Sequence, residues 1–94
     1  MNTILDILRL AIDHKASDIF VVTGFPVAIK TNDSIDPIDE ERMMPDMTRE
    51  LIRQIYELAG DRDMGPLEKD GDDDFSFSVK QLGRFRCNAY KQRG

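Results

Sequence analysis

Residues 75–92 read FSFSVKQLGRFRCNAYKQ, and this stretch carries the clearest secondary-structure signal of the chain. Its first five residues alternate apolar and polar side chains, which is typical of a β-strand with one buried face. Residues 80–83 then predict a turn, and a returning strand is expected to pair with the first. Because side chains of a strand point alternately to opposite faces, the returning strand divides into two sets. Those expected to face the core are Phe85, Cys87 and Ala89, and those expected to face away are Arg84, Arg86, Asn88 and Tyr90.

The preceding residues supply apolar patterns of helical and strand period. They predict, in chain order, a helix capped by Asn2 or Thr3 and ending near Lys15, a buried strand at 19–22, an antiparallel strand at 26–31, an edge strand at 34–38, a polar connection at 39–42, a helix at about 46–59 stopped by Gly60, and a solvated loop at 61–74. The resulting order, α-β-β-(β)-α-β-β, predicts an α+β fold with an antiparallel sheet and helices to one side.

The charge of the chain is unevenly distributed. Its 94 residues predict one domain, and the formal net charge is −5. Residues 80–94 hold five bases and no acid, whereas residues 1–79 hold eight bases and 18 acids, a net charge of −10. We expect an acidic body to repel nucleic acid and a basic final strand to attract anions. Apolar runs are far shorter than the roughly 18 residues that span a bilayer, so no membrane insertion is expected.

Self-sufficient catalytic chemistry is not indicated. The phosphate-binding loop G-x-x-x-x-G-K-[ST] is absent, so these residues are not expected to bind and activate a nucleotide alone. His14, the single histidine, is interpreted as a helix-end residue, and Cys87 as a small buried thiol without reactivity. The acidic run at 70–74 lacks the spacing of a calcium loop and is interpreted as a solvated turn. No catalytic residue and no metal site are therefore predicted.

Arg84 and Arg86 are the candidate binding residues. At strand spacing their guanidinium groups lie side by side about 7 Å apart, which suits an anion. The alternative is that they keep an exposed strand soluble and protect its edge, and the residues alone leave the two interpretations nearly even. Arg93 adds a third cation. A nucleic-acid interface is not expected, because Phe85 and Tyr90 face opposite sides of the strand and offer no shared stacking surface.

Four segments resemble the PilT-type pilus-retraction ATPases. Residues 83–94, GRFRCNAYKQRG, are similar to the family's "aRFRvNaf.qrG" strand, and residues 15–21, KASDIFV, to its "gASDlHl" segment. Residues 26–30, PVAIK, lie where the family has "PpmiRvdG", and residues 73–77, DDFSF, resemble "e.DfSf". The segments occur in family order and span nearly the whole chain. Phe20, Lys30 and Asp33 depart from the family pattern, which indicates a divergent member.

The resemblance implies the N-terminal, PAS-like domain of a hexameric motor ATPase for twitching motility or type II–IV secretion. A C-terminal RecA-like P-loop domain, absent from these 94 residues, would bind ATP and Mg²⁺. By position, the resemblance assigns Arg84, Arg86 and, less directly, Arg93 to the ATP phosphates. It implies as partners that P-loop domain, neighbouring subunits of a homohexamer, and pilus or secretion platform proteins of the inner membrane. The implied location is the cytoplasm, or the inner-membrane periphery through those partners.

A different class of function stays open, namely a free-standing PAS-like sensor or protein-interaction module. A sensor needs an internal pocket with a few convergent polar groups. The residues expected to face the core are bulky and apolar, which favours a filled interior: Val21, Ile29, Phe75, Phe77 and Phe85.

Overall fold

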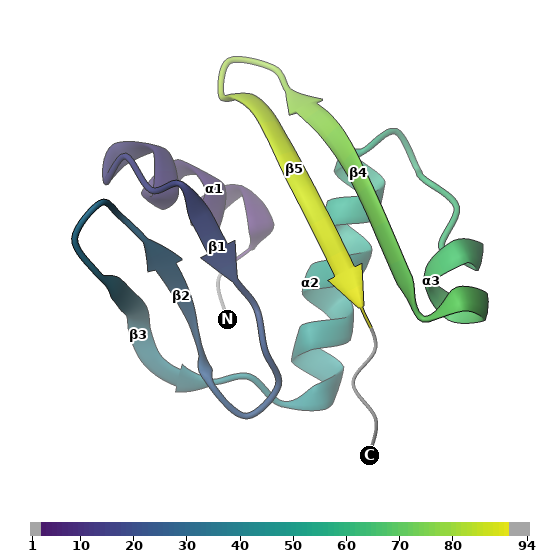
Figure 1. Cartoon of the computed structure of the whole chain (residues 1–94), viewed down its shortest axis with the longest axis horizontal. Coiled ribbons are helices and arrows are strands. Elements are labelled where there is room, and N and C mark those ends of the chain that lie inside the picture. The colour runs from purple at the N-terminus through teal and green to yellow at the C-terminus, as the bar shows by residue number, and fades with distance from the viewer. Residues whose placement is uncertain (1–2, 91–94) are drawn as a thin grey trace. The chain divides into compact units, whose positions relative to one another are not determined.

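The structure is a computed structural model, and it describes residues 3–90 as an α+β fold with antiparallel sheets (Figure 1). The chain forms two compact units, which divide within the second helix after Leu51. The strands fall into a three-stranded sheet in the first unit and a two-stranded hairpin in the second. Within the described residues, no helix combines the length and the apolar character needed to cross a bilayer.

The first helix, α1 (Ile4–Asp13), begins at a capping box. The Thr3 hydroxyl accepts a hydrogen bond from the Asp6 amide (3.3 Å), and the Asp6 carboxylate accepts one from the Thr3 amide (3.2 Å). The helix ends two residues before the predicted Lys15, which has a left-handed backbone (φ 56°). His14 is the C-cap, and its Nδ1–H donates to the Leu10 carbonyl (2.9 Å), as a helix-end role requires.

Three antiparallel strands, β1 (Asp18–Phe20), β2 (Pro26–Lys30) and β3 (Ile35–Arg42), form the sheet of the first unit in the order β1-β2-β3. The predicted buried strand at 19–22 was wrong in two respects. It ends at Phe20, because only residues 18–20 pair with β2, and Phe20 remains 39% exposed. The predicted polar connection at 39–42 was also wrong, since those residues continue β3.

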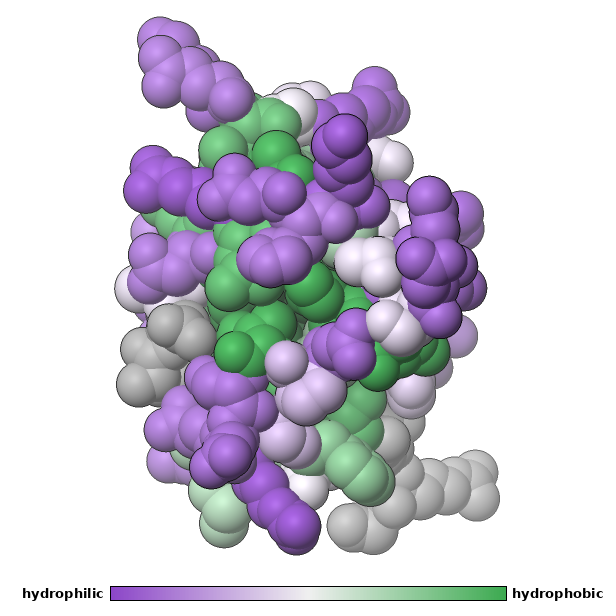
Figure 2. Space-filling view, turned by 90° about the vertical axis from the view of Figure 1, so that its left-hand side faces the viewer, coloured by the Kyte–Doolittle hydropathy of each residue, from purple (hydrophilic) through white to green (hydrophobic). Residues whose placement is uncertain are grey.

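The core of the first unit is built from one face of α1, the inward side of β2 and the residues beyond β3. Its buried members are Ile4, Ile7, Leu8, Ala11, Val27, Ile29, Met43 and Leu51. A pocket lined by Ile7, Val27 and Met43, among others, has room for about 10 Å³, which is about one water molecule. This volume gives no support to a metabolite sensor. Figure 2 shows apolar surface among hydrophilic side chains on one face, and Phe25, Ile35 and Met44 are exposed members of this unit.

The second helix, α2 (Pro45–Leu58), lies close to its predicted bounds and is followed by Gly60 at φ 78°. The predicted loop at 61–74 was wrong, because it contains a short helix, α3 (Gly65–Asp70), and the start of β4. Pro66 fits the first turn of α3, where no helical donor is lost. Leu67 is buried at 7% exposure, and Gly71 ends the helix in the left-handed conformation (φ 85°).

The strands β4 (Asp72–Val79) and β5 (Gly83–Tyr90) form the predicted hairpin, with Val79 opposite Gly83 at the turn. The predicted alternation is confirmed: Phe75, Phe77 and Ala89 are buried, and Phe85 and Cys87 are half-buried. The aromatic rings support one another, since the centroids of Phe77 and Phe85 lie 5.7 Å apart and those of Tyr56 and Phe75 lie 4.9 Å apart. The hairpin thus has one apolar face and one polar face, and the polar face holds the candidate site.

Candidate functional site on the outer face of the hairpin

The outer face of the β4–β5 hairpin brings together the two arginines that the sequence singles out. Arg84 lies directly opposite Ser78, and Arg86 lies directly opposite Ser76. All four side chains are exposed. Two guanidinium groups flanked by two small hydroxyl-bearing side chains leave room for an anion with several oxygen atoms.

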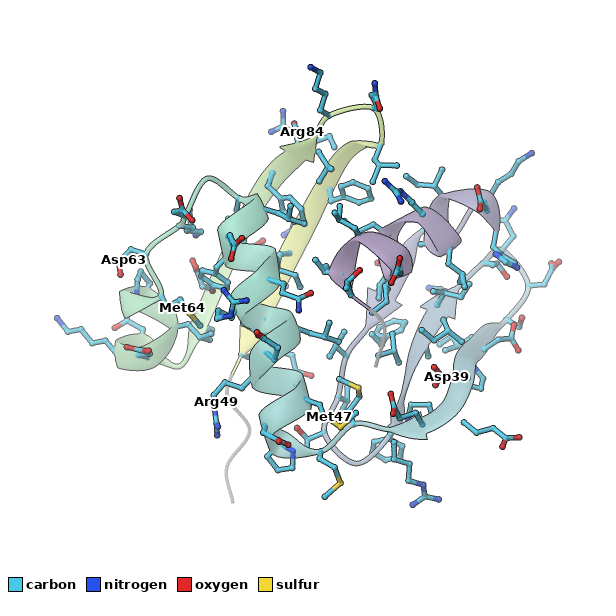
Figure 3. All side chains as sticks on the ribbon, turned by 180° about the vertical axis from the view of Figure 1, so that it is seen from behind. Asp39, Met47, Arg49, Asp63, Met64 and Arg84 are labelled. Carbon is cyan, nitrogen blue, oxygen red and sulfur yellow. The ribbon has the colours of Figure 1, made fainter. Side chains whose placement is uncertain are left out.

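Arg84 lies near the turn end of the hairpin (Figure 3). Within the described part of the chain it forms no ion pair, so its five N–H donors are available to a ligand. Arg93 falls outside the described residues, and its assignment to an anion stays a prediction.

Arg86 has a partner that the sequence did not predict. Its Nε and Nη2 donate to the two carboxylate oxygens of Asp74, at 3.1 and 2.7 Å. The pair is exposed, with 73% of the Arg86 side chain and 48% of the Asp74 side chain accessible. The hydrogen bond from Arg86 lowers the pKa of Asp74 below its usual range, and the pKa of Arg86 rises in return. Both arginines lie on one face as predicted, but of the two it is Arg84 that has no carboxylate partner within residues 3–90.

Asp73, on the opposite face of β4, is buried and anchors a second polar cluster. Its carboxylate accepts hydrogen bonds from the Tyr56 hydroxyl and from Nε and Nη2 of Arg62, each at 2.9 Å. The Arg62 guanidinium also lies over the Phe75 ring, 4.3 Å from its centroid. Arg62 lowers the pKa of Asp73, and burial together with Asp73 raises the pKa of Tyr56. The acidic run at 70–74, predicted as a solvated turn, is therefore partly a buried structural site.

The comparisons with known proteins point to one family, although no family model matches the chain. The chain is 30% identical over 87 residues to the type IV pilus ATPase PilU of Pseudomonas aeruginosa. This match covers 93% of the chain and 22% of that relative. It is 28% identical over 89 residues to the pilus retraction ATPase PilT of the same species, covering 95% and 25%. A crystal structure of the retraction motor PilT with bound ADP matches the whole chain and 27% of its own chain, with a TM-score of 0.82 and 37% identity.

This chain is an N-terminal domain of the PilT type. It spans about a quarter of the length of the curated relatives that it matches. The resemblance noted at the basic strand is thereby confirmed, and the fold of the described residues matches that of PilT.

Cys87 of this PilT-type domain has the unreactive character that the sequence predicts. Burial raises the pKa of the Cys87 thiol to about 11, with the charges of Asp73 and Asp74 adding to the effect, so the thiol stays protonated near neutral pH. No group of three or more His, Cys, Asp or Glu side chains between residues 3 and 90 is arranged to hold a metal ion.

The sequence reasoning missed three members of the outer face of the PilT-type domain, namely Asp74, Ser76 and Ser78. The signal was available in part, because a turn at 80–83 sets Val79 opposite Gly83 and hence every later pair of the ladder. It would have placed Ser76 and Ser78 opposite the arginines. The cluster of Asp73 with Tyr56 and Arg62 had no such local signal, since its members come from three separate segments.

Proposed function

We propose that this domain is the N-terminal part of a hexameric motor ATPase for type IV pilus retraction, as in twitching motility, or for type II secretion. In this proposal a C-terminal RecA-like P-loop domain holds ATP together with Mg²⁺, and Arg84 and Arg86 of the N-terminal domain contact the phosphates of that ATP. The observation that carries the proposal is the pair of exposed guanidinium groups on one hairpin face, in a domain with the fold of an ADP-bound pilus motor. Arg93 is a third, more distant candidate.

The chemistry of the face fits this role. Transfer of a phosphoryl group is accelerated mainly by cations that neutralise charge on the phosphate oxygens as the bond breaks. An arginine from a separate domain can supply that charge only when the domain closes on the nucleotide, so hydrolysis becomes linked to rigid-body motion. The domain then contacts its own P-loop domain and neighbouring subunits, and acts in the cytoplasm against platform proteins of the inner membrane.

The test begins with the gene. Its reading frame is expected to encode G-x-x-x-x-G-K-[ST] downstream of residue 94, and a frame without that motif would exclude the proposal. In the complete protein, Arg84→Ala and Arg86→Ala are each expected to slow ATP hydrolysis by about 10-fold or more, since arginines that stabilise the transition state contribute factors of about 10³–10⁵.

Arg49→Ala is the matched control, because it removes the same charge from an exposed position on α2 (Figure 3). Circular dichroism spectra of all three variants should match that of the unsubstituted protein, because none of the three side chains is buried. Equal rates for Arg49→Ala and Arg86→Ala would contradict a role of the hairpin face in hydrolysis.

A further inference from the structure

The guanidinium fork of Arg86 is already occupied in the structure. Asp74 accepts hydrogen bonds from Nε and Nη2, so both carboxylate oxygens bind one edge of the guanidinium in a bidentate pair. A phosphate group can take this same edge in bidentate recognition. A phosphate that binds there competes with Asp74 for the Nε and Nη2 donors.

The register of the hairpin explains why this carboxylate reaches this arginine. Asp74 lies directly opposite Asn88, and Arg86 lies directly opposite Ser76, so Asp74 and Arg86 are diagonal neighbours on the outer face. Diagonal neighbours across a strand pair are within reach of a long side chain. Arg84 has Ser78 opposite and makes no ion pair within residues 3–90. The two arginines thus differ in state although they share a face.

We propose that Asp74 is a competing carboxylate that holds Arg86 away from phosphate until a nucleotide binds. The inference rests on the proposed function and adds a partner exchange to it: Arg86 leaves Asp74 for a phosphate, whereas Arg84 binds without giving up a partner. Asp74 lowers the affinity of the face for polyphosphate because its ion pair with Arg86 has to break before a phosphate takes the same donors.

The size of the effect follows from the exposure of the pair. Exposed ion pairs contribute little to stability, because water screens them and two side chains have to be ordered. The measured range for such pairs corresponds to a factor of about 1.5–5 in an equilibrium constant. Removing Asp74 is therefore expected to raise the affinity for ATP by about two- to fivefold, with the change appearing in KM rather than in kcat.

The experiment compares Asp74→Asn with Asp72→Asn in the complete protein by measuring ATP hydrolysis against ATP concentration. Asp72 is the matched control, since it lies on the same strand and face, carries the same charge, and is opposite Tyr90 instead of a neighbour of Arg86. Asp74→Asn should lower KM by about two- to fivefold, at the scale set by exposed ion pairs. Asp72→Asn should leave KM nearly unchanged. Equal KM values in the two variants would overturn the inference.

A double substitution separates this inference from the proposed function. If Asp74 acts through Arg86, then Asp74→Asn has no effect on KM in an Arg86→Ala background. A persistent effect would overturn the exchange. If Arg86→Ala alone leaves hydrolysis unchanged, the proposed function fails as well. If Arg86→Ala slows hydrolysis while Asp74→Asn matches Asp72→Asn, only the exchange fails.

The ion pair itself is accessible in the 94-residue chain. Carboxyl ¹³C NMR titration should show that the pKa of Asp74 rises when Arg86 is changed to Ala, because the hydrogen-bonded cation that lowers it is lost. A pKa of Asp74 that does not respond to Arg86→Ala would show that the pair does not form in solution, and would overturn the inference.

Discussion

Changing Tyr56 to Phe tests the buried cluster with the smallest perturbation that the chain offers. The substitution removes one hydroxyl group and keeps the ring, so the edge-to-face contact with Phe75 at 4.9 Å is retained. What is lost is the 2.9 Å hydrogen bond that the Tyr56 hydroxyl donates to the Asp73 carboxylate. Tyr56 is 2% exposed and Asp73 is 8% exposed, so water does not readily replace the missing donor.

The magnitude follows from these contacts. A hydrogen bond to a charged acceptor contributes about 1.5–3 kcal/mol to stability. We expect about 2 kcal/mol for Tyr56→Phe, in the lower half of that range, because Arg62 still donates to both oxygens of Asp73. Against a total stability of about 5–15 kcal/mol for an ordinary domain, this is a large fraction.

The assay is urea unfolding followed by circular dichroism. With a slope near 1–2 kcal/mol per molar urea for a small domain, the midpoint should fall by about 1–2 M at an unchanged slope. Tyr90→Phe is the matched control, since it removes the same group from a side chain that is 62% exposed, and its effect should stay within about 0.5 kcal/mol. If the two substitutions lower the midpoint equally, the hydroxyl of Tyr56 does not stabilise the fold and the reasoning is refuted.

Two further predictions concern titrating groups of the same unit. Because Arg62 holds the pKa of Asp73 below its unfolded value, the stability due to this carboxylate is fully present above about pH 4 and is lost as the pH falls through the lowered folded-state pKa. Urea midpoints measured between pH 6 and pH 2 should therefore decline less in Asp73→Asn than in the unsubstituted chain. Parallel declines in the two proteins would contradict the assignment. Since burial raises the pKa of Cys87 to about 11, the reaction of its thiol with a disulfide reagent should be slow at pH 8 and should accelerate toward pH 11. A reaction rate at pH 8 equal to that of the urea-unfolded chain would show that the thiol is not protected.

Local patterns were sufficient where the structure depends on neighbouring residues. The cap of α1 at Thr3, the end of α2 before Gly60 and the alternation of β4 and β5 all follow from periods or caps contained within a few residues. Local patterns failed to predict an element where its length depends on the segments that pair with it. The strand β1 is three residues long because only residues 18–20 find partners on β2, a limit that β-propensity at residues 21 and 22 could not indicate.

What the sequence alone determined about the site is that Arg84 and Arg86 share an exposed face, because the two-residue period of a strand is a local property of the backbone. The family also followed from sequence, since four short segments keep their order along the chain. Only the tertiary structure decided that Arg86 is engaged by Asp74 and that Asp73 is buried with Tyr56 and Arg62. Those partners lie 11 to 17 residues apart in the chain. The Arg86–Asp74 pair needs the register of the hairpin and side-chain conformations that bring the two groups together. The cluster of Asp73, Tyr56 and Arg62 forms only when the strand register and the position of α2 are both fixed, and no spacing in the sequence encodes that choice.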